Sequence, residues 1–355
     1  MKIKKLLGIF LSICIVISFS GCNQRAEEPQ TDDDASSTTA ETEDTAAVES
    51  DYSGEELELS FAHNLAVDSV LDQAANQFAD LVAEKSGGKI TVTVYPAAQL
   101  GNESDMLEGM ELGTIDMMLG TTTYLSNVSP EFAVLDLPFL FSDVDHVKEI
   151  LDGEVGEALK TDLLEQKQMR IMGYMNSGFR IMLTSDTQLV DLDSFHGVKM
   201  RSPETEVYIE MFESLGASPT PISLSETYTS IQTGVVEGVE MSAQQLYTNK
   251  FHEVTNYAAR TNHIFTTVCP IISNSKWDSL SEEAQAILDE SMVEVIDWEW
   301  DAFDQADEEA LQSMVDAGLE VNDIDQAPLS EACSDLYKEI SEKNNCADLL
   351  EMIQQ

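Results

Sequence analysis

The sequence has very little positive charge. Its 355 residues include 18 lysines and arginines against 66 aspartates and glutamates, for a formal net charge of −48 at pH 7. A chain this acidic repels phosphate backbones and anionic headgroups. Nucleic acid and anionic lipid surfaces are therefore excluded as electrostatic partners.

The sequence also lacks the residue patterns that most enzymes and metal sites need. It contains no glycine-rich phosphate loop, no GxSxG motif and no His/Cys pair at metal-ligand spacing. Acidic pairs are too frequent in so acidic a chain to indicate hydrolysis. We therefore expect no catalytic residue, no metal and no cofactor. The histidines are solitary, and we expect surface or structural roles for all of them: His63, His146, His196, His252 and His263.

Cysteine is scarce, with five residues in the whole chain. Cys14 and Cys22 belong to the N-terminal segment, which leaves Cys269, Cys333 and Cys346 for the folded body. An odd number leaves at least one thiol unpaired. Two alternatives stay open: a Cys333–Cys346 disulfide, which an exported protein permits, or separate buried thiols.

The first residues have the pattern of a secretory leader. Lys2, Lys4 and Lys5 precede an apolar run over residues 6–19, which is too short to span a bilayer as a mature helix. The run ends in Phe-Ser-Gly-Cys at 19–22, which resembles the bacterial lipobox. An ordinary cleavable signal with a chance cysteine is the alternative. We expect a signal peptide at 1–21 and two acyl chains on Cys22, which anchor the protein to the extracytoplasmic face of the cell membrane.

The next segment, residues 22–54, is expected to be a disordered acidic linker. It is rich in Asp, Glu, Ser and Thr and has almost no apolar bulk, so it cannot offset its ordering entropy by burial. About 300 residues with ordinary hydrophobic content remain, which is enough for two lobes.

The body alternates strand and helix patterns. Strands are predicted at Leu57–Ala62, Ile90–Tyr95 and residues 115–119, with helices over 70–82 and 103–112 between them. A second series is expected to begin near Met169, with strands at 169–174, 180–184 and 198–201 and a helix over 204–215. Strand–helix–strand units of this length imply parallel pairing. Two such series predict two α/β lobes with a cleft between them.

One long helix is predicted near the C-terminus. Ser281 is a good N-cap, followed by the first-turn acids Glu282 and Glu283. The helical pattern continues to Gly318, roughly 37 residues or about 55 Å if unbroken. A helix of that length is expected to span both lobes, although two helices meeting at a kink would give the same pattern.

Arginine is the rare residue that stands out. The chain has Arg25, Arg170, Arg180, Arg201 and Arg260 and no others. Arg201 ends a β-branched strand, and Pro203 prevents the strand from continuing. Ligands sit at such strand ends in open α/β sheets, and a guanidinium matches a carboxylate in two parallel bonds. A carboxylate-binding site is one interpretation, and a structural pair with one of the many acids is the other.

Ordered motifs between about residues 57 and 318 give the chain a family resemblance. It resembles the solute-binding component of TRAP (tripartite ATP-independent periplasmic) transporters, the dicarboxylate-binding DctP-like family. Any one motif is weak evidence, but their common order is specific. The motifs are YPAAQLG (95–101), GTIDM (113–117), LPFLF (137–141), GFR (178–180), GVKMRSP (197–203), LGASPTP (215–221), SETY (225–228) and QTGVVEG (232–238).

The resemblance implies a type II periplasmic-binding-protein-like fold. In this α/β architecture two lobes close over a ligand around a hinge, and a long C-terminal helix spans both. Lobe I is expected to comprise residues 55–177 plus 267–306, and lobe II residues 178–266 plus 307–355. The implied function is capture of a small organic acid and its delivery to TRAP membrane permease subunits driven by an ion gradient.

The resemblance also implies site residues. Arg201 would clamp the ligand carboxylate and Arg180 would give a second positive contact. The segment EGVEMS (237–242) departs from a family pattern that usually reads Asp-Gly-Gln-Glu-Asn-Pro, so a polar amide is replaced by the apolar Met241. Thr121 stands where some sialic-acid-binding members carry a glutamate, so their ligand is not transferred. The other implied pocket positions are Asn64, Glu103, Thr121, Tyr124, Leu224 and Met241.

The identity of the acid is left between two classes. A C4-dicarboxylate needs a cation at both ends, which Arg201 and Arg180 could supply. A sugar acid or hydroxy acid needs one clamp plus acceptors for hydroxyls, and the altered pocket at Met241 favours this class slightly. A lipoprotein that reports ligand to a membrane sensor is the alternative function, and an exported hydrolase or lyase is disfavoured by the missing catalytic patterns.

Overall fold

The structure is a computed structural model that describes residues 52–355. The predicted signal peptide, Cys22 and nearly all of the predicted linker lie outside the described residues. The folded body described below belongs to the unit of residues 47–355, of which residues 52–355 are described. None of the helices within residues 52–355 is long and apolar enough to cross a membrane.

The first sheet has six strands, in the order β2-β1-β3-β11-β4, with β5 paired to β11. β1 lies parallel to β2 and β3, whereas β11 runs antiparallel to β3, β4 and β5. The predicted strands at 57–62 and 90–95 are confirmed, and the third lies two residues further on than predicted. The strands are β1 (Leu57–Ala62), β2 (Ile90–Tyr95), β3 (Met117–Thr121), β4 (Met169–Ile171), β5 (Met175–Phe179) and β11 (Phe265–Ser273).

The crossover helices of this sheet begin at capping residues. α1 (Val70–Lys85) begins after Ser69, whose hydroxyl accepts a hydrogen bond from the backbone N–H of Asp72. α2 (Glu103–Glu111) begins after Asn102, which forms a reciprocal capping box with Asp105. The cap therefore determines where Glu103, the first residue of α2, lies relative to the sheet.

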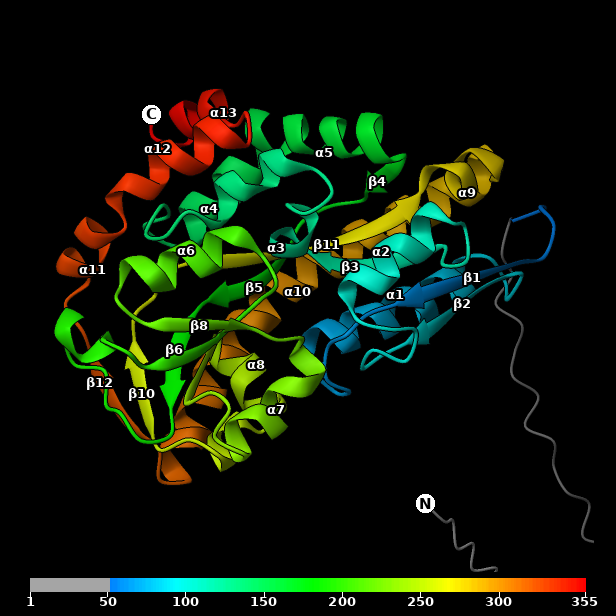
Figure 1. Cartoon of the computed structure of the whole chain (residues 1–355). Coiled ribbons are helices and arrows are strands. Elements are labelled where there is room, and N and C mark those ends of the chain that lie inside the picture. Colours follow the sequence, from blue (N-terminus) through cyan, green and yellow to red (C-terminus); the bar gives the residue numbers. More distant parts are fainter. Residues whose placement is uncertain (1–51) are drawn as a thin grey trace, which may run out of the picture. The chain divides into compact units, whose positions relative to one another are not determined.

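The second sheet also has six strands, in the order β12-β10-β6-β9-β7-β8. β7 is parallel to β8 and β9, while β6 is antiparallel to β9 and β10. Figure 1 shows β1 and β2 of the first sheet on one side of the body and β6, β10 and β12 of the second on the other. The strands are β6 (Ile181–Thr184), β7 (Lys199–Ser202), β8 (Ser218–Pro221), β9 (Gly238–Met241), β10 (Tyr257–Arg260) and β12 (Glu320–Asp323).

The prediction that a second series begins near Met169 was wrong. β4 and β5 both pair with β11, so they belong to the first sheet, and the second sheet begins with β6. The chain passes from the first sheet to the second at Arg180, between β5 and β6, and returns between β10 and β11. The two-lobed α/β fold is confirmed, while the residue bounds predicted for the lobes stay a prediction.

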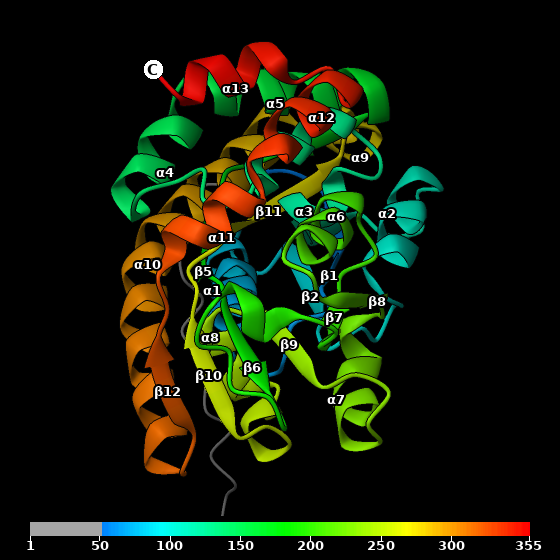
Figure 2. The same cartoon turned by 60° about the vertical axis from the view of Figure 1, so that its left-hand side comes forward.

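The long C-terminal helix is confirmed as one unbroken element. α10 (Glu282–Asp316) has 35 residues and begins after the N-cap Ser281. Its N-terminal half packs Leu288 and Met292 into the core beside the first sheet, and its C-terminal half packs Ala310 and Met314 into the core of the second. Figure 2 shows α10 running along the body as far as β12.

The helices after α10 cover one end of the body. α12 contacts the 3₁₀ helix Pro130–Asp136 and α6 (Glu206–Ser214), and α13 contacts α5 (Glu154–Lys167). α12 therefore packs on an element that follows β3 of the first sheet and on one that follows β7 of the second. The remaining helices named below are α7 (Leu224–Gln232), α8 (Ala243–Thr248), α12 (Ser334–Lys343) and α13 (Ala347–Ile353).

The three cysteines of the described body are free and buried. The Cys333–Cys346 disulfide is absent from the structure, and the alternative of separate buried thiols holds. Burial raises the pKa of Cys333 to about 12 and that of Cys346 to about 11, so both thiols stay protonated at neutral pH.

Candidate ligand-binding site

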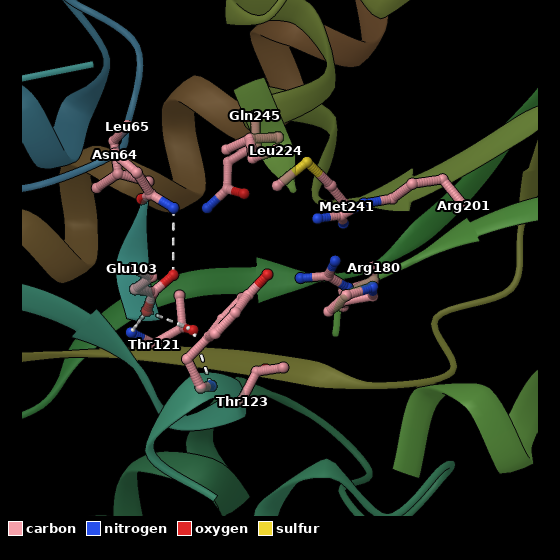
Figure 3. Close-up of a pocket in the computed structure, with 12 residues that line it drawn as sticks. Asn64, Leu65, Glu103, Thr121, Thr123, Arg180, Arg201, Leu224, Met241 and Gln245 are labelled. Atoms are coloured by element: carbon pink, nitrogen blue, oxygen red, sulfur yellow. Dashed lines mark hydrogen bonds between the residues drawn. The ribbon is translucent and has the colours of Figure 1, made fainter. Parts of the chain in front are cut away.

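A cavity brings together every substrate-binding residue predicted from the sequence. The space between its atoms is about 380 Å³, open solvent included. Figure 3 shows Asn64, Glu103 and Thr121 on one side and Arg180, Arg201 and Met241 on the other. Its lining consists of Asn64, Leu65, Glu103, Thr121, Thr123, Tyr124, Arg180, Arg201, Pro203, Leu224, Met241 and Gln245.

Arg201 is a buried cation that has no counter-ion among residues 52–355. It lies near the end of β7 and only 2% of its surface is exposed. The one protein hydrogen bond of its guanidinium within residues 52–355 runs from Nε to the carbonyl oxygen of Ile222, at 2.8 Å. In this part of the chain ion pairs form at Arg180 and Arg260 but none forms at Arg201. Both terminal nitrogens are therefore available for a planar, bidentate anion such as a carboxylate.

Burial of the unpaired Arg201 charge costs free energy in the ligand-free protein. Burial lowers its pKa, although an arginine stays charged in a protein. An isolated charge removed from water costs several kcal/mol unless it is paired. The neighbouring Tyr124 brings no negative charge, because burial raises its pKa to about 12. The cavity therefore presents an unbalanced positive charge at this wall.

Arg180, the other predicted arginine, also lines the cavity, but its charge is balanced inside the protein. Its Nε and Nη2 form an ion pair with the Glu240 carboxylate, and Nη2 also donates to the Glu240 carbonyl oxygen at 2.8 Å. Nη1 donates to Thr266 Oγ1 at 2.9 Å, and the guanidinium lies 5.2 Å from the ring centroid of Tyr208. Of its five N–H groups, one remains for a ligand.

Glu240 is held ionised by this contact. Burial alone would raise its pKa, but the charge and hydrogen bonds of Arg180, together with His263, lower it to about 2. His263 Nε2 lies 3.4 Å from Glu240 Oε2, and its Nδ1 lies 2.7 Å from Thr261 Oγ1. The Arg180–Glu240 pair is thus a fixed, neutral element behind the cavity.

Hydrogen-bond acceptors lie across the cavity from the arginines. Glu103 Oε1 accepts hydrogen bonds from the backbone N–H and the hydroxyl of Thr121, the latter at 2.8 Å, and Oε2 accepts one from Asn64 Nδ2 at 3.2 Å. Burial raises the pKa of Glu103 to about 7, against the opposing effects of these hydrogen bonds and of Arg201. Glu103 can therefore accept a ligand hydroxyl when ionised and donate to a ligand oxygen when protonated.

The sequence did not indicate that Leu65, Thr123, Pro203 and Gln245 also line the cavity. Pro203 lies within a quoted motif, and Gln245 follows the motif that contains Met241. The amide of Gln245 donates to Ser177 Oγ at 2.6 Å, so it supplies an oriented polar group near the place where Met241 replaces one. Its position on α8, one turn after β9 ends, was the signal that could have indicated it.

A second buried carboxyl lies behind Thr123. Asp136 is fully buried and its Oδ1 accepts a hydrogen bond from Thr123 Oγ1 at 3.1 Å. Burial raises the pKa of Asp136 to about 7. Within residues 52–355 there is no group of three or more His, Cys, Asp or Glu side chains arranged to hold a metal ion. The guanidinium of Arg201 and the acceptors around Glu103 are suited to binding an organic anion with hydroxyl groups.

Known proteins share both the sequence and the fold. Residues 61–344 match the family model for bacterial extracellular solute-binding protein, family 7 (DctP). The chain is 30% identical over 283 residues to the 2,3-diketo-L-gulonate-binding periplasmic protein of Escherichia coli strain K12, covering 79% of this chain and 86% of that protein. It is also 30% identical over 294 residues to the C4-dicarboxylate-binding periplasmic protein of Rhodobacter capsulatus, covering 81% and 88%.

A solved structure supports the same relationship. A TRAP periplasmic solute-binding protein from Sulfitobacter sp. NAS-14.1 with bound β-D-galacturonate superposes with a TM-score of 0.81 at 28% identity, covering 83% of this chain and 99% of that one. The family match spans most of the body and includes both sheets. The chain belongs to the DctP family of bacterial extracellular solute-binding proteins of TRAP transporters.

Proposed function

We propose that the chain captures a small hydroxylated monocarboxylate, a sugar acid or hydroxy acid, in this cavity and delivers it to TRAP membrane permease subunits. The observation that supports this most directly is the buried guanidinium of Arg201, which has both terminal nitrogens free and no protein counter-ion within the described residues. A ligand carboxylate supplies the missing charge in the bidentate geometry that a guanidinium favours.

The charge distribution favours one carboxylate over two. Arg180 would have to give up its pairing with Glu240 before it could clamp a second carboxylate with its full charge. Across the cavity, Glu103 would repel a second anionic group when ionised and would hydrogen-bond a hydroxyl. Relatives bind both classes, a diketogulonate in one and C4-dicarboxylates in another, so this preference is a property proposed for this chain.

The site residues act from both lobes. Asn64 follows β1, Glu103 begins α2 and Thr121 ends β3, all on the side of the first sheet, whereas Arg201 and Met241 come from strands of the second. A ligand held by Arg201 and Glu103 would join the lobes, and this supports closure around the ligand by relative motion of the lobes. With the lobe bounds proposed from the sequence, residues 55–177 plus 267–306 and 178–266 plus 307–355, Arg180 lies in lobe II close to the first crossing between the lobes.

A ligand panel tests the binding proposal. Thermal unfolding is followed with uronates, aldonates, keto acids and C4-dicarboxylates, because a ligand that binds only the folded state raises the midpoint by linkage. Uronates or aldonates are expected to raise it in the wild type and not in Arg201→Ala. Arg260→Ala is the matched control, since Arg260 is partly exposed and pairs with Asp323. A shift that survives Arg201→Ala, or a larger shift with dicarboxylates, would contradict the proposal.

We further propose that Cys22 bears the lipid anchor. The leader that ends in Phe-Ser-Gly-Cys supports this, and an acidic spacer would hold the binding body away from the membrane. Metabolic labelling with an alkyne palmitate analogue should label the wild type and not Cys22→Ser. Release of the variant into the medium or periplasm should accompany the loss of label, and equal labelling of both proteins would exclude the anchor.

A further inference from the structure

The cleft continues beyond the ligand cavity into a second space, here named the outer chamber. It contains about 700 Å³ between its atoms, open solvent included. It shares Asn64 and Leu224 with the inner cavity, so the two spaces meet at these side chains. Its other lining residues are Ala66, Val67, Ala97, Ala98, Asn102, Ser225 and Asn249.

The same chain segments line both spaces. Leu65 lines the inner cavity, and its neighbour Ala66 lines the outer chamber. Likewise, Glu103 lines the inner cavity and its neighbour Asn102 lines the outer chamber. Gln245 on α8 lines the inner cavity, and Asn249, the C-cap of the same helix four residues further on, lines the outer chamber. The outer chamber is therefore an extension of the binding cleft between both lobes and not a separate surface feature.

The chemistry of the outer chamber differs from that of the inner cavity. None of its lining residues is charged, although the chain has 66 acidic residues. Each asparagine uses one end of its amide within the protein. Asn64 Nδ2 donates to Glu103, Asn249 Nδ2 donates to the Gln245 carbonyl, and Asn102 Oδ1 accepts from the Asp105 N–H. This leaves two amide oxygens and one amide NH₂ for hydroxyl groups of a ligand.

Apolar groups complete the lining. Val67 is 55% exposed, and Ala97 and Ala98 both adopt left-handed backbone angles, with φ of 52° and 58°. Hydrogen bonds from the Ala97 N–H to Leu65 O and from the Ala98 N–H to His63 O hold this turn against the segment that enters the inner cavity. Methyl groups beside amides suit the alternating C–H and O–H faces of a sugar ring.

We propose that the outer chamber is a subsite for an uncharged sugar linked to the far end of the captured acid. The ligand class is then an aldobiouronic acid, a uronic acid joined through C1 to a neutral sugar, with its carboxylate on Arg201. This inference rests on the proposed function, because it places the carboxylate in the inner cavity. A neutral lining disfavours a second uronate there, since its carboxylate would meet no cationic partner.

Isothermal titration tests the subsite with three probes: a free uronate, the corresponding aldobiouronic acid with a neutral sugar, and the diuronate. Glucuronate and galacturonate series are both used. For wild type we expect the aldobiouronic acid to bind at least tenfold more tightly than the free uronate, and the diuronate to bind less tightly than the aldobiouronic acid. Equal or weaker binding of the aldobiouronic acid overturns the subsite.

A variant that blocks the outer chamber tests whether the tighter binding of the aldobiouronic acid arises there. Ser225→Trp places a bulky side chain in the outer chamber from an exposed position on α7, and Thr229→Trp on the same helix, outside the lining, is its control. Ser225→Trp should weaken binding of the aldobiouronic acid at least tenfold and change the affinity for the free uronate less than threefold. Thr229→Trp should change neither affinity. Equal losses for both ligands in Ser225→Trp would refute the subsite. If no acid of either length binds to wild type, the proposed function itself fails.

Discussion

Replacing Arg201 by methionine should make the ligand-free protein more stable while abolishing ligand binding. Methionine retains an apolar stem of similar length and removes the buried charge. The variant loses the hydrogen bond from Nε to Ile222 O, worth about 1 kcal/mol. It also removes the cost of an unpaired buried ion, which is several kcal/mol. We expect the free energy of unfolding to rise by about 1–3 kcal/mol, because the second effect is the larger.

The assay is urea and thermal unfolding of protein freed from co-purified ligand by unfolding, dialysis and refolding. For a body of this size a gain of 1–3 kcal/mol corresponds to a rise in Tm of about 2–6 °C. Saturating ligand should stabilise wild type by about 2.7 kcal/mol at a concentration of 100 Kd and should leave Arg201→Met unchanged. Arg260→Met, at a partly exposed ion pair, should shift stability by less than about 0.5 kcal/mol. A ligand-free Arg201→Met that is less stable than wild type by more than about 1 kcal/mol would refute the argument that the unpaired charge is costly.

Three further predictions concern the buried groups around the site. Glu103 has a folded pKa of about 7 against an ordinary 4.5, so the folded state binds more protons than the unfolded state. As pH rises from 4.5 to about 7, wild type should therefore lose on the order of 3 kcal/mol of unfolding free energy relative to Glu103→Gln. Urea titrations at several pH values measure this difference, and parallel pH profiles of the two proteins would contradict it. Glu240→Gln leaves Arg180 buried without its counter-ion and should lower the free energy of unfolding by about 3–5 kcal/mol. The exposed Glu339→Gln is its control, and equal unfolding curves would show that the pair contributes nothing. Because Cys333 and Cys346 are free and buried, a reducing agent should leave Tm unchanged, and a thiol reagent should modify them only after unfolding. A reductant-dependent Tm would indicate a disulfide.

The sequence was most informative where strands and helices carry regular apolar patterns. β1 and β2 are short, alternating or β-branched segments with clear ends, and their bounds were predicted to the residue. β5 was missed because its buried positions include Asn176 and Ser177, which carry no hydrophobic signal. Its backbone is held instead by a hydrogen bond from the Asn176 N–H to Glu299 on α10, 123 residues away in sequence. Such a contact is invisible to local periodicity.

The binding site likewise has residues that local sequence patterns indicate and residues whose role depends on long-range contacts. Arg201 could be identified because arginine is rare and because Pro203 marks the end of its strand. The neutralisation of Arg180 could not be predicted, because Glu240 is one of 66 acidic residues and lies 60 positions further along the chain. Pairing of β6 with β9 places Ile181 opposite Met241, which brings the two segments together. The rarity of arginine therefore identified Arg201 and Arg180 as candidates. Only the fold could show that Arg180 is paired and that Arg201 is not.

The charges inside the cavity explain how so acidic a protein can bury an anion. The Arg180–Glu240 pair is neutral with or without ligand, which leaves Arg201 and Glu103 as the groups that respond. A ligand carboxylate neutralises Arg201, and this removes one of the influences that lower the pKa of Glu103. Glu103 then takes up a proton more readily, and the liganded cavity approaches zero net charge. A neutral interior is the condition under which a closed cleft costs least to desolvate, so the same balance that selects a single carboxylate also favours closure around it.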